Sequence, residues 1–320
     1  MPAQIARRKF LGGMMATVFA GATSRFGLPG ESSSPFRVAV INDEISQDFE
    51  HVCEIASHEF GMGWIELRSM WNKNIVSLDE KEVVEAQRIL AKYQLKVTDI
   101  ASPLFKVDWP GAPKSRFSEA KSFGANFSLA QQDQVLEQAI EMAKAFQTDR
   151  VRCFDFWRLD DPVLYRYAIN EKLREAADKA QKKGIILLLE NEPSCNTATA
   201  TEAVPVLGAI QSPSFMLNWD PGNAAAAGEI PYPDGYNLLP KNRIGHCHCK
   251  DVVRKGKKTD WAPMGGGIID WAGQFKALKR DGYRYAVSLE THWNGGGSPE
   301  ESSRKSWAGM KKILQKDGLL

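Results

Sequence analysis

From residue 36 onward, two patterns of apolar residues alternate along the chain. Runs of five to eight residues, rich in β-branched and aromatic side chains, favour β-strands. Between them apolar residues recur every three or four positions, as at Val135, Ala139, Met142 and Phe146, which is the spacing of an amphipathic helix. The predicted strands span residues 36–41, 64–68, 96–101, 150–154, 185–190, 215–220, 243–250 and 285–290.

The helices have recognisable starts, and one segment breaks the alternation. Asp79, Asp161 with Pro162, and Asp270 stand where N-caps are expected.

Residues 105–129 carry proline, glycine, tryptophan and several charges without periodicity. A long insertion of this kind in a compact domain predicts a lid or binding loop.

Alternating strands and helices predict a parallel sheet. Eight such units predict one domain, a (β/α)8 TIM barrel over residues 36–320. The alternative is an open, doubly wound sheet, which usually has a glycine-rich phosphate-binding turn after its first strand. The turn at Asn42, Asp43 and Glu44 lacks those glycines.

The first 35 residues follow neither pattern. Residues 1–22 combine the basic triplet Arg7, Arg8 and Lys9, a short apolar stretch, and the A-x-A cleavage pattern Ala20-Gly21-Ala22. Residues 7–11 resemble the R-R-x-F-L core of twin-arginine signals, and the apolar stretch is too short to span a bilayer. We therefore expect export through the twin-arginine translocase to a periplasmic or secreted location, without stable membrane insertion after processing. Residues 23–35 are a predicted flexible linker.

Charge and cysteine content exclude several classes of function. Loss of the signal changes the formal charge from +2 to −1, because it removes Arg7, Arg8 and Lys9. A near-neutral domain argues against nucleic acid as a partner. The five cysteines are odd in number and have no C-x-x-C spacing, so neither a disulfide scaffold nor a zinc cluster is expected.

Three predicted strands end on a lone carboxylate: Glu190, Asp220 and Glu290. Burying an unpaired carboxylate is costly. In TIM barrels the carboxyl ends of the strands meet at one face, where the chemistry takes place. We therefore expect these three side chains to converge and to require a cation.

The strand at 243–250 adds a histidine. Side chains alternate along a strand, so His246, His248 and Lys250 share one face and Cys247 and Cys249 share the other. With the histidines inward, a mainly oxygen ligand set suits Mn²⁺, with Mg²⁺, Co²⁺, Fe²⁺ or Zn²⁺ as alternatives. The predicted metal ligands are Glu190, Asp220, His248 and Glu290. Inverting this strand would favour zinc, but it would also place Lys250 in the helix layer.

A further group of polar and aromatic residues near the strand ends predicts contacts with a carbohydrate. Each has a structural alternative: a packed or ligand-orienting histidine for His246, a rim lysine for Lys250, ion pairs for the other charged residues, and a seal over the barrel mouth for Trp109. The predicted substrate contacts are Glu66, Trp109, Arg152, Glu192, Asn223, His246, Lys250 and His292. Three consecutive glycines at 265–267 also suggest an anion-binding loop.

Over residues 36–316 the chain resembles the sugar phosphate isomerase/epimerase group of xylose isomerase-like TIM barrels. The resemblance rests on LENEP at 189–193, WDPGN at 219–223, HCHCKD at 246–251, PMGGGIIDW at 263–271 and LETH at 289–292. It implies the same four metal ligands, with Glu190 and Glu290 as the acid/base pair. Asn223 departs from the histidine common there in the epimerases and in a branch that cleaves abasic DNA. The five histidines are also too few for the three-zinc site of that branch.

These observations predict an exported, divalent-metal-dependent sugar isomerase or epimerase. It would abstract a proton next to a carbonyl through a metal-stabilised enediolate. A dehydratase or lyase of keto-sugars or 3-keto-glycosides on the same metal site is the first alternative. A non-catalytic sugar-binding barrel is the second. Either a monomer or a homo-oligomer is compatible with the sequence.

Overall fold

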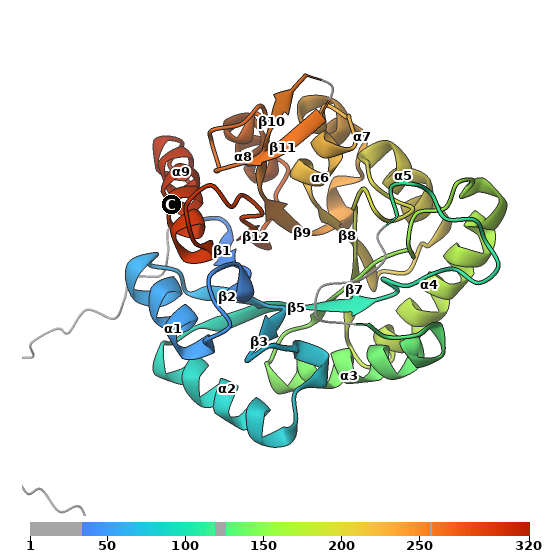
Figure 1. Ribbon diagram of the computed structural model, residues 1–320, viewed down its shortest axis with the longest axis horizontal. Coiled ribbons are helices and arrows are strands. Elements are labelled where there is room, and N and C mark those ends of the chain that lie inside the picture. The colour runs from blue at the N-terminus through green and yellow to red at the C-terminus, as the bar shows by residue number, and fades with distance from the viewer. Residues whose placement is uncertain (1–33, 119–125, 257) are drawn as a thin grey trace, which may run out of the picture. The chain divides into compact units, whose positions relative to one another are not determined.

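Eight parallel strands form a ring in the computed structural model, which describes residues 34–118, 126–256 and 258–320 (Figure 1). Their hydrogen-bonded order is β1 (Arg37–Val40), β12 (Ala286–Leu289), β9 (Ile244–Cys249), β8 (Phe215–Trp219), β7 (Ile186–Glu190), β6 (Arg150–Cys153), β5 (Lys96–Leu104) and β2 (Trp64–Leu67). A parallel bridge between Ile41 and Glu66 joins β1 to β2 and nearly closes the ring. The predicted (β/α)8 barrel is confirmed.

Helices follow the strands around the outside of the ring (Figure 1). They are α1 (Phe49–Glu54), α2 (Glu80–Lys92), α3 (Gln132–Ala145), α4 (Arg166–Gln181), α5 (Ala200–Ala209), α6 (Pro221–Ala226), α7 (Tyr236–Leu238), α8 (Trp271–Arg280) and α9 (Pro299–Lys316). Asp79 caps α2 and Asp270 caps α8, as predicted. The helix expected to begin at Asp161 instead begins with a 3₁₀ turn at Val163–Tyr165, which leads into α4.

The core lies between the barrel and the helices. The apolar face of α3 buries Val135 and Ala139, and that of α9 buries Met310. Cys247 and Cys249 lie in the same core and are free thiols. Their burial there agrees with the prediction that they occupy the outward face of the strand. Burial raises the pKa of Cys249 well above its ordinary value, so this thiol is unreactive.

Two short hairpins were not expected from the sequence. They are β3 (Ser69–Met70) with β4 (Lys73–Asn74), and β10 (Asp251–Lys255) with β11 (Lys258–Ala262). The second hairpin is mostly polar and leaves the barrel directly after β9 (Figure 1). Periodicity does not find it, because hydrogen bonds between its two strands define it rather than burial of one apolar face.

The predicted export signal (1–22) and residues 23–33 of the predicted linker lie outside the described residues. Within the described ranges, no helix combines the length and the apolar character needed to cross a membrane.

The glycine loop at 265–267 does not offer free donors to an anion. Asp251 accepts hydrogen bonds from the backbone N–H groups of Gly265, Gly267 and Ile269. A Cβ on Gly267 would lie 2.1 Å from Asp251 Oδ1, so the carboxylate and the loop backbone are in direct contact. The anion that this loop binds is therefore the protein's own Asp251 carboxylate.

Helix α9 approaches this loop so closely that Gly309→Ala should destabilise the protein. The new Cβ would lie 1.8 Å from the carbonyl oxygen of Met264, a backbone atom that cannot rotate away. We expect a loss of about 1–3 kcal/mol in the free energy of unfolding. Gly208→Ala in α5 is the matched control, because nothing lies within 4 Å of its Cβ. It should stabilise the protein by up to about 1 kcal/mol. Denaturant unfolding of both variants measures the difference, and equal stabilities would contradict the contact.

Candidate metal and sugar site

Four consecutive strands of the ring bring the predicted metal ligands together. Glu190 is the last residue of β7, Asp220 and Glu290 directly follow β8 and β12, and His248 lies on β9. All four side chains are buried, and one potential ligand atom from each lies within 4.8 Å of every other. The parallel strands end at one level, which is why residues 100 positions apart converge.

The histidine Nδ1 atom is central to this cluster. It lies 3.2 Å from Glu290 Oε2, 3.3 Å from Glu190 Oε1 and 3.6 Å from Asp220 Oδ2. Asp220 Oδ2 and Glu190 Oε2 are buried, and each is approached by one cation, Lys250 Nζ at 2.8 Å and Arg152 Nη1 at 3.1 Å. Each carboxylate oxygen has a second lone pair, and such oxygens beside an imidazole nitrogen suit a divalent cation. The four side chains therefore fit a single metal ion.

Cations of the protein keep these carboxylates ionised. Burial opposes ionisation of Glu190, but His248 and Arg152 lower its pKa to about 2. Burial likewise opposes ionisation of Glu290, whose pKa is nevertheless held well below its ordinary value by Lys250, His292 and His248. Both glutamates are therefore ionised at neutral pH.

Lys250 closes one side of the cluster. Its Nζ lies 2.8 Å from Asp220 Oδ2 and 2.5 Å from Glu290 Oε2, and its side chain is almost fully buried. Burial lowers the pKa of this lysine, but Asp220 and Glu290 raise it further than burial lowers it. Lys250 is therefore a fixed positive charge at the floor of the site.

Beneath the cluster lies a buried chain of acids and histidines. His248 Nε2 lies 3.0 Å from Glu66 Oε1, His246 Nε2 lies 3.1 Å from Glu66 Oε2, and His246 Nδ1 lies 3.3 Å from Asp99 Oδ1. His246 and Glu66 have no exposed surface and do not line the cavity described below. They were predicted as substrate contacts, and the structure corrects this: both support His248 from below.

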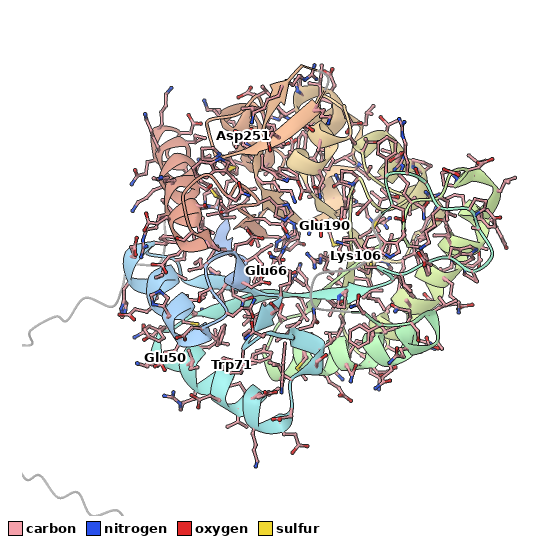
Figure 2. The ribbon with its side chains drawn as sticks, viewed as in Figure 1. Glu50, Glu66, Trp71, Lys106, Glu190 and Asp251 are labelled. Carbon is pink, nitrogen blue, oxygen red and sulfur yellow. The ribbon has the colours of Figure 1, made fainter. Side chains whose placement is uncertain are left out.

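A cavity of about 780 Å³ opens above the cluster, within the size range of small-molecule sites. Five predicted contacts line it: Arg152, Glu192, Asn223, Lys250 and His292. Figure 2 shows Glu190 and Lys106 pointing into the central region of the ring. Trp109 does not line the cavity. Instead its ring packs edge-on against Phe156 with centroids 4.8 Å apart, and it is partly buried against the hydrophobic core.

Several cavity residues were not among the predicted substrate contacts. Arg68, which directly follows β2, lies 2.9 Å from Glu290 Oε1 and also pairs with Asp43 and Glu44. Those two acids belong to the 3₁₀ turn Asn42–Glu44, a short distance after the end of β1. Lys106 Nζ lies 2.7 Å from Glu192 Oε2.

Trp261 enters the site from the unexpected β10–β11 hairpin. Its ring lies 5.2 Å from Lys250 Nζ and meets the ring of His292 edge-on at 5.0 Å. An aromatic face beside polar groups is suited to packing against the C–H surface of a sugar ring. No sequence signal marked this residue, because only the hairpin carries it back over the barrel.

Three solved structures illustrate the likeness of this fold to known proteins. The probable 3-DHS dehydratase AsbF of Bacillus anthracis is 19% identical, with 87% of this chain and 98% of that chain covered and a TM-score of 0.65. A xylose isomerase-like TIM barrel protein of Mycobacterium smegmatis in complex with magnesium is 16% identical (89% and 98% covered, TM-score 0.63). A D-allulose 3-epimerase of a Methylomonas species in complex with D-allulose is 16% identical (88% and 97% covered, TM-score 0.62).

At these identities the structural likeness establishes the fold alone, and no curated protein is significantly similar in sequence. The profile of one family nevertheless matches most of the chain, over residues 55–313. This range includes all four side chains of the metal cluster. The chain belongs to the xylose isomerase-like TIM barrel family.

Proposed function

We propose that the protein is an exported, divalent-metal-dependent isomerase or epimerase of an unphosphorylated keto-sugar or related carbohydrate. One observation carries this proposal: two ionised glutamates, Glu190 and Glu290, belong to a single buried set of metal ligands at the floor of a cavity. A cation at this position would act as a Lewis acid on a substrate carbonyl and its neighbouring hydroxyl. The mainly oxygen ligand set favours Mn²⁺.

The protein's own side chains supply the proton transfers. One ionised glutamate removes the proton from the carbon next to the carbonyl. The other, after it has taken a proton from solvent water, returns that proton to the substrate, and exchange with water then resets both groups. Return to the opposite face of the same carbon gives epimerisation, and return to the neighbouring carbon gives isomerisation. Lys250 stabilises the negative charge that develops on the substrate oxygen.

Other cavity residues would hold the sugar. Arg152, Asn223 and His292 contact the two glutamates and also line the cavity. Glu192, held by Lys106, presents a carboxylate to substrate hydroxyls. Such groups bind and orient a polyol without being consumed in the reaction.

A lyase is the second candidate, and the position of Lys250 favours it. Its ammonium lies 2.5 Å from Glu290 Oε2 inside the cavity. After a glutamate removes the proton next to the carbonyl, the C–O bond at the β-carbon breaks with its electron pair going to oxygen. The glutamate that took the carbon-bound proton would donate it to that leaving oxygen while Lys250 stabilises the developing negative charge, which balances the elimination of water or an alcohol.

Deuterium exchange tests the proposal. The metal-loaded protein is incubated in D₂O with a panel of unphosphorylated ketoses and 3-keto-glycosides, and the products are analysed by mass spectrometry and NMR. Isomerase or epimerase activity predicts incorporation of solvent deuterium without loss of mass. Loss of water or an aglycone supports the lyase. A protein that binds metal and sugar but promotes neither process is a sugar-binding barrel, and both enzyme proposals are then wrong.

A further inference from the structure

A second cavity adjoins the first. It encloses about 550 Å³, and its wall shares Phe117, Pro193 and Ala226 with the wall of the metal-site cavity. The stretch Ala225–Gly228 of its wall has only small side chains. The two cavities therefore lie next to each other across a low rim, and a ligand longer than one sugar ring that crosses this rim would occupy both.

One face of the β10–β11 hairpin runs along both cavities. Val252 pairs with Trp261 and Arg254 pairs with Thr259, so these side chains share a face of the hairpin. Trp261 lines the first cavity, and Arg254 and Thr259 line the second. The hairpin thus forms a continuous wall that leads outward from the metal cluster.

The second cavity is positively charged. Arg158, Arg254 and Lys258 line it, and among the described residues no aspartate or glutamate does so. Arg158 is neutralised by a bidentate ion pair with Glu202. Arg254 and Lys258 form no ion pair with any described residue, although acids balance almost every cation of the first cavity. Two unbalanced cations therefore face a hollow of ligand size.

We infer that the second cavity is a subsite for a negatively charged unit, so that the substrate is a glycoside or disaccharide with an acidic group. The reacting ring lies over the metal cluster beside Trp261, and the acidic unit reaches Arg254 and Lys258. This inference rests on the proposed function for the identity of the reacting ring. The charge and the contiguity of the second cavity do not depend on that function.

Calorimetry on the full-length, metal-loaded protein tests the subsite with three disaccharides of one linkage. Their distal units are glucose, glucuronate and 6-sulfoglucose. We expect one or both acidic disaccharides to bind about tenfold more tightly than the neutral one, because each exposed charge pair contributes a modest gain. The ratio of the dissociation constants of the two acidic disaccharides shows whether the subsite prefers a carboxylate or a sulfate. Raising the salt concentration should reduce the preference.

Arg254→Glu should abolish that preference, and Lys255→Glu is the matched control. Lys255 undergoes the same change of charge one residue further along, but it does not line the second cavity and it pairs with Asp260. The control should retain the preference. The subsite would be overturned if the unmodified protein bound all three disaccharides equally tightly. It would also be overturned if both variants lost the preference for acidic disaccharides to the same extent. Because binding needs no turnover, the subsite can stand even if no ketose exchanges deuterium, and it can fail even if exchange is observed.

Discussion

Replacing Glu290 with glutamine is expected to lower kcat for keto-sugar turnover by about 10²- to 10⁴-fold, the usual contribution of a general acid or base. The amide can neither take nor return a proton as the ionised carboxylate can. Three neighbouring cations hold Glu290 ionised despite its burial. The measurement is kcat at saturating metal, with the bound metal determined in the same samples, because Glu290 also belongs to the cluster.

If the enzyme is an epimerase, comparing the two glutamates allows a sharper prediction. In Glu290→Gln, Glu190 should still remove and return a proton on its own side of the carbon. Solvent deuterium would then enter one epimer without inversion, and Glu190→Gln should show the converse. Glu192→Gln is the control, because it makes the same change two residues from Glu190 in a residue paired with Lys106. It should alter KM more than kcat. Wild-type kcat in a fully metallated Glu290→Gln would exclude Glu290 from proton transfer.

Replacing Glu66 with leucine is expected to weaken metal binding by about 10- to 100-fold, the usual effect of removing a group that orients a metal-binding histidine. Glu66 accepts from His248 Nε2 and so directs Nδ1 at the carboxylate cluster, where a bound metal would replace the Nδ1 proton. Without that acceptor, the buried Nε2–H has no carboxylate partner and the ring loses its fixed orientation. Calorimetric titration of the metal-free protein with Mn²⁺ measures the effect without any need for turnover.

Glu66→Gln separates orientation from simple packing. The amide oxygen can still accept from His248, and the amide nitrogen can donate to His246 if that ring shifts its proton towards Asp99. Glutamine should therefore recover much of the metal affinity that leucine loses. If both variants bind Mn²⁺ as tightly as the unmodified protein, Glu66 does not orient His248. Unfolding curves of both variants show whether a change in affinity reflects loss of the fold instead.

The convergence of the four candidate metal ligands was predictable because it depends on two local properties of the chain. Side chains alternate along a strand, which separates His248 from Cys247 without knowledge of any neighbour. The carboxyl ends of parallel strands meet at one face, which brings Glu190 and Glu290 together once the (β/α)8 pattern is recognised. The same reasoning placed Arg152 and Lys250 at the cavity.

The partners of His246 were not predictable. His246 and His248 have the same parity, which places His246 one residue pair below His248, but only the structure shows it between Glu66 and Asp99. The stagger of the neighbouring strands decides which side chains meet at one depth, and stagger is a property of the closed sheet rather than of one strand. Trp109 packs against Phe156 instead of lining the cavity for a related reason, since the position of a long loop depends on what it packs against.

The sequence by itself determined the eightfold alternation of strand and helix, the inward face of each strand, and hence the four residues of the metal cluster. Each follows from the period of the side chains or from the shared direction of the strands. The tertiary structure alone decided which residues lie beneath the cluster, that Asp251 occupies the glycine loop, and that the β10–β11 hairpin brings Trp261 and Arg254 to the cavities. These outcomes depend on contacts between segments distant in sequence, and no local pattern specifies such contacts.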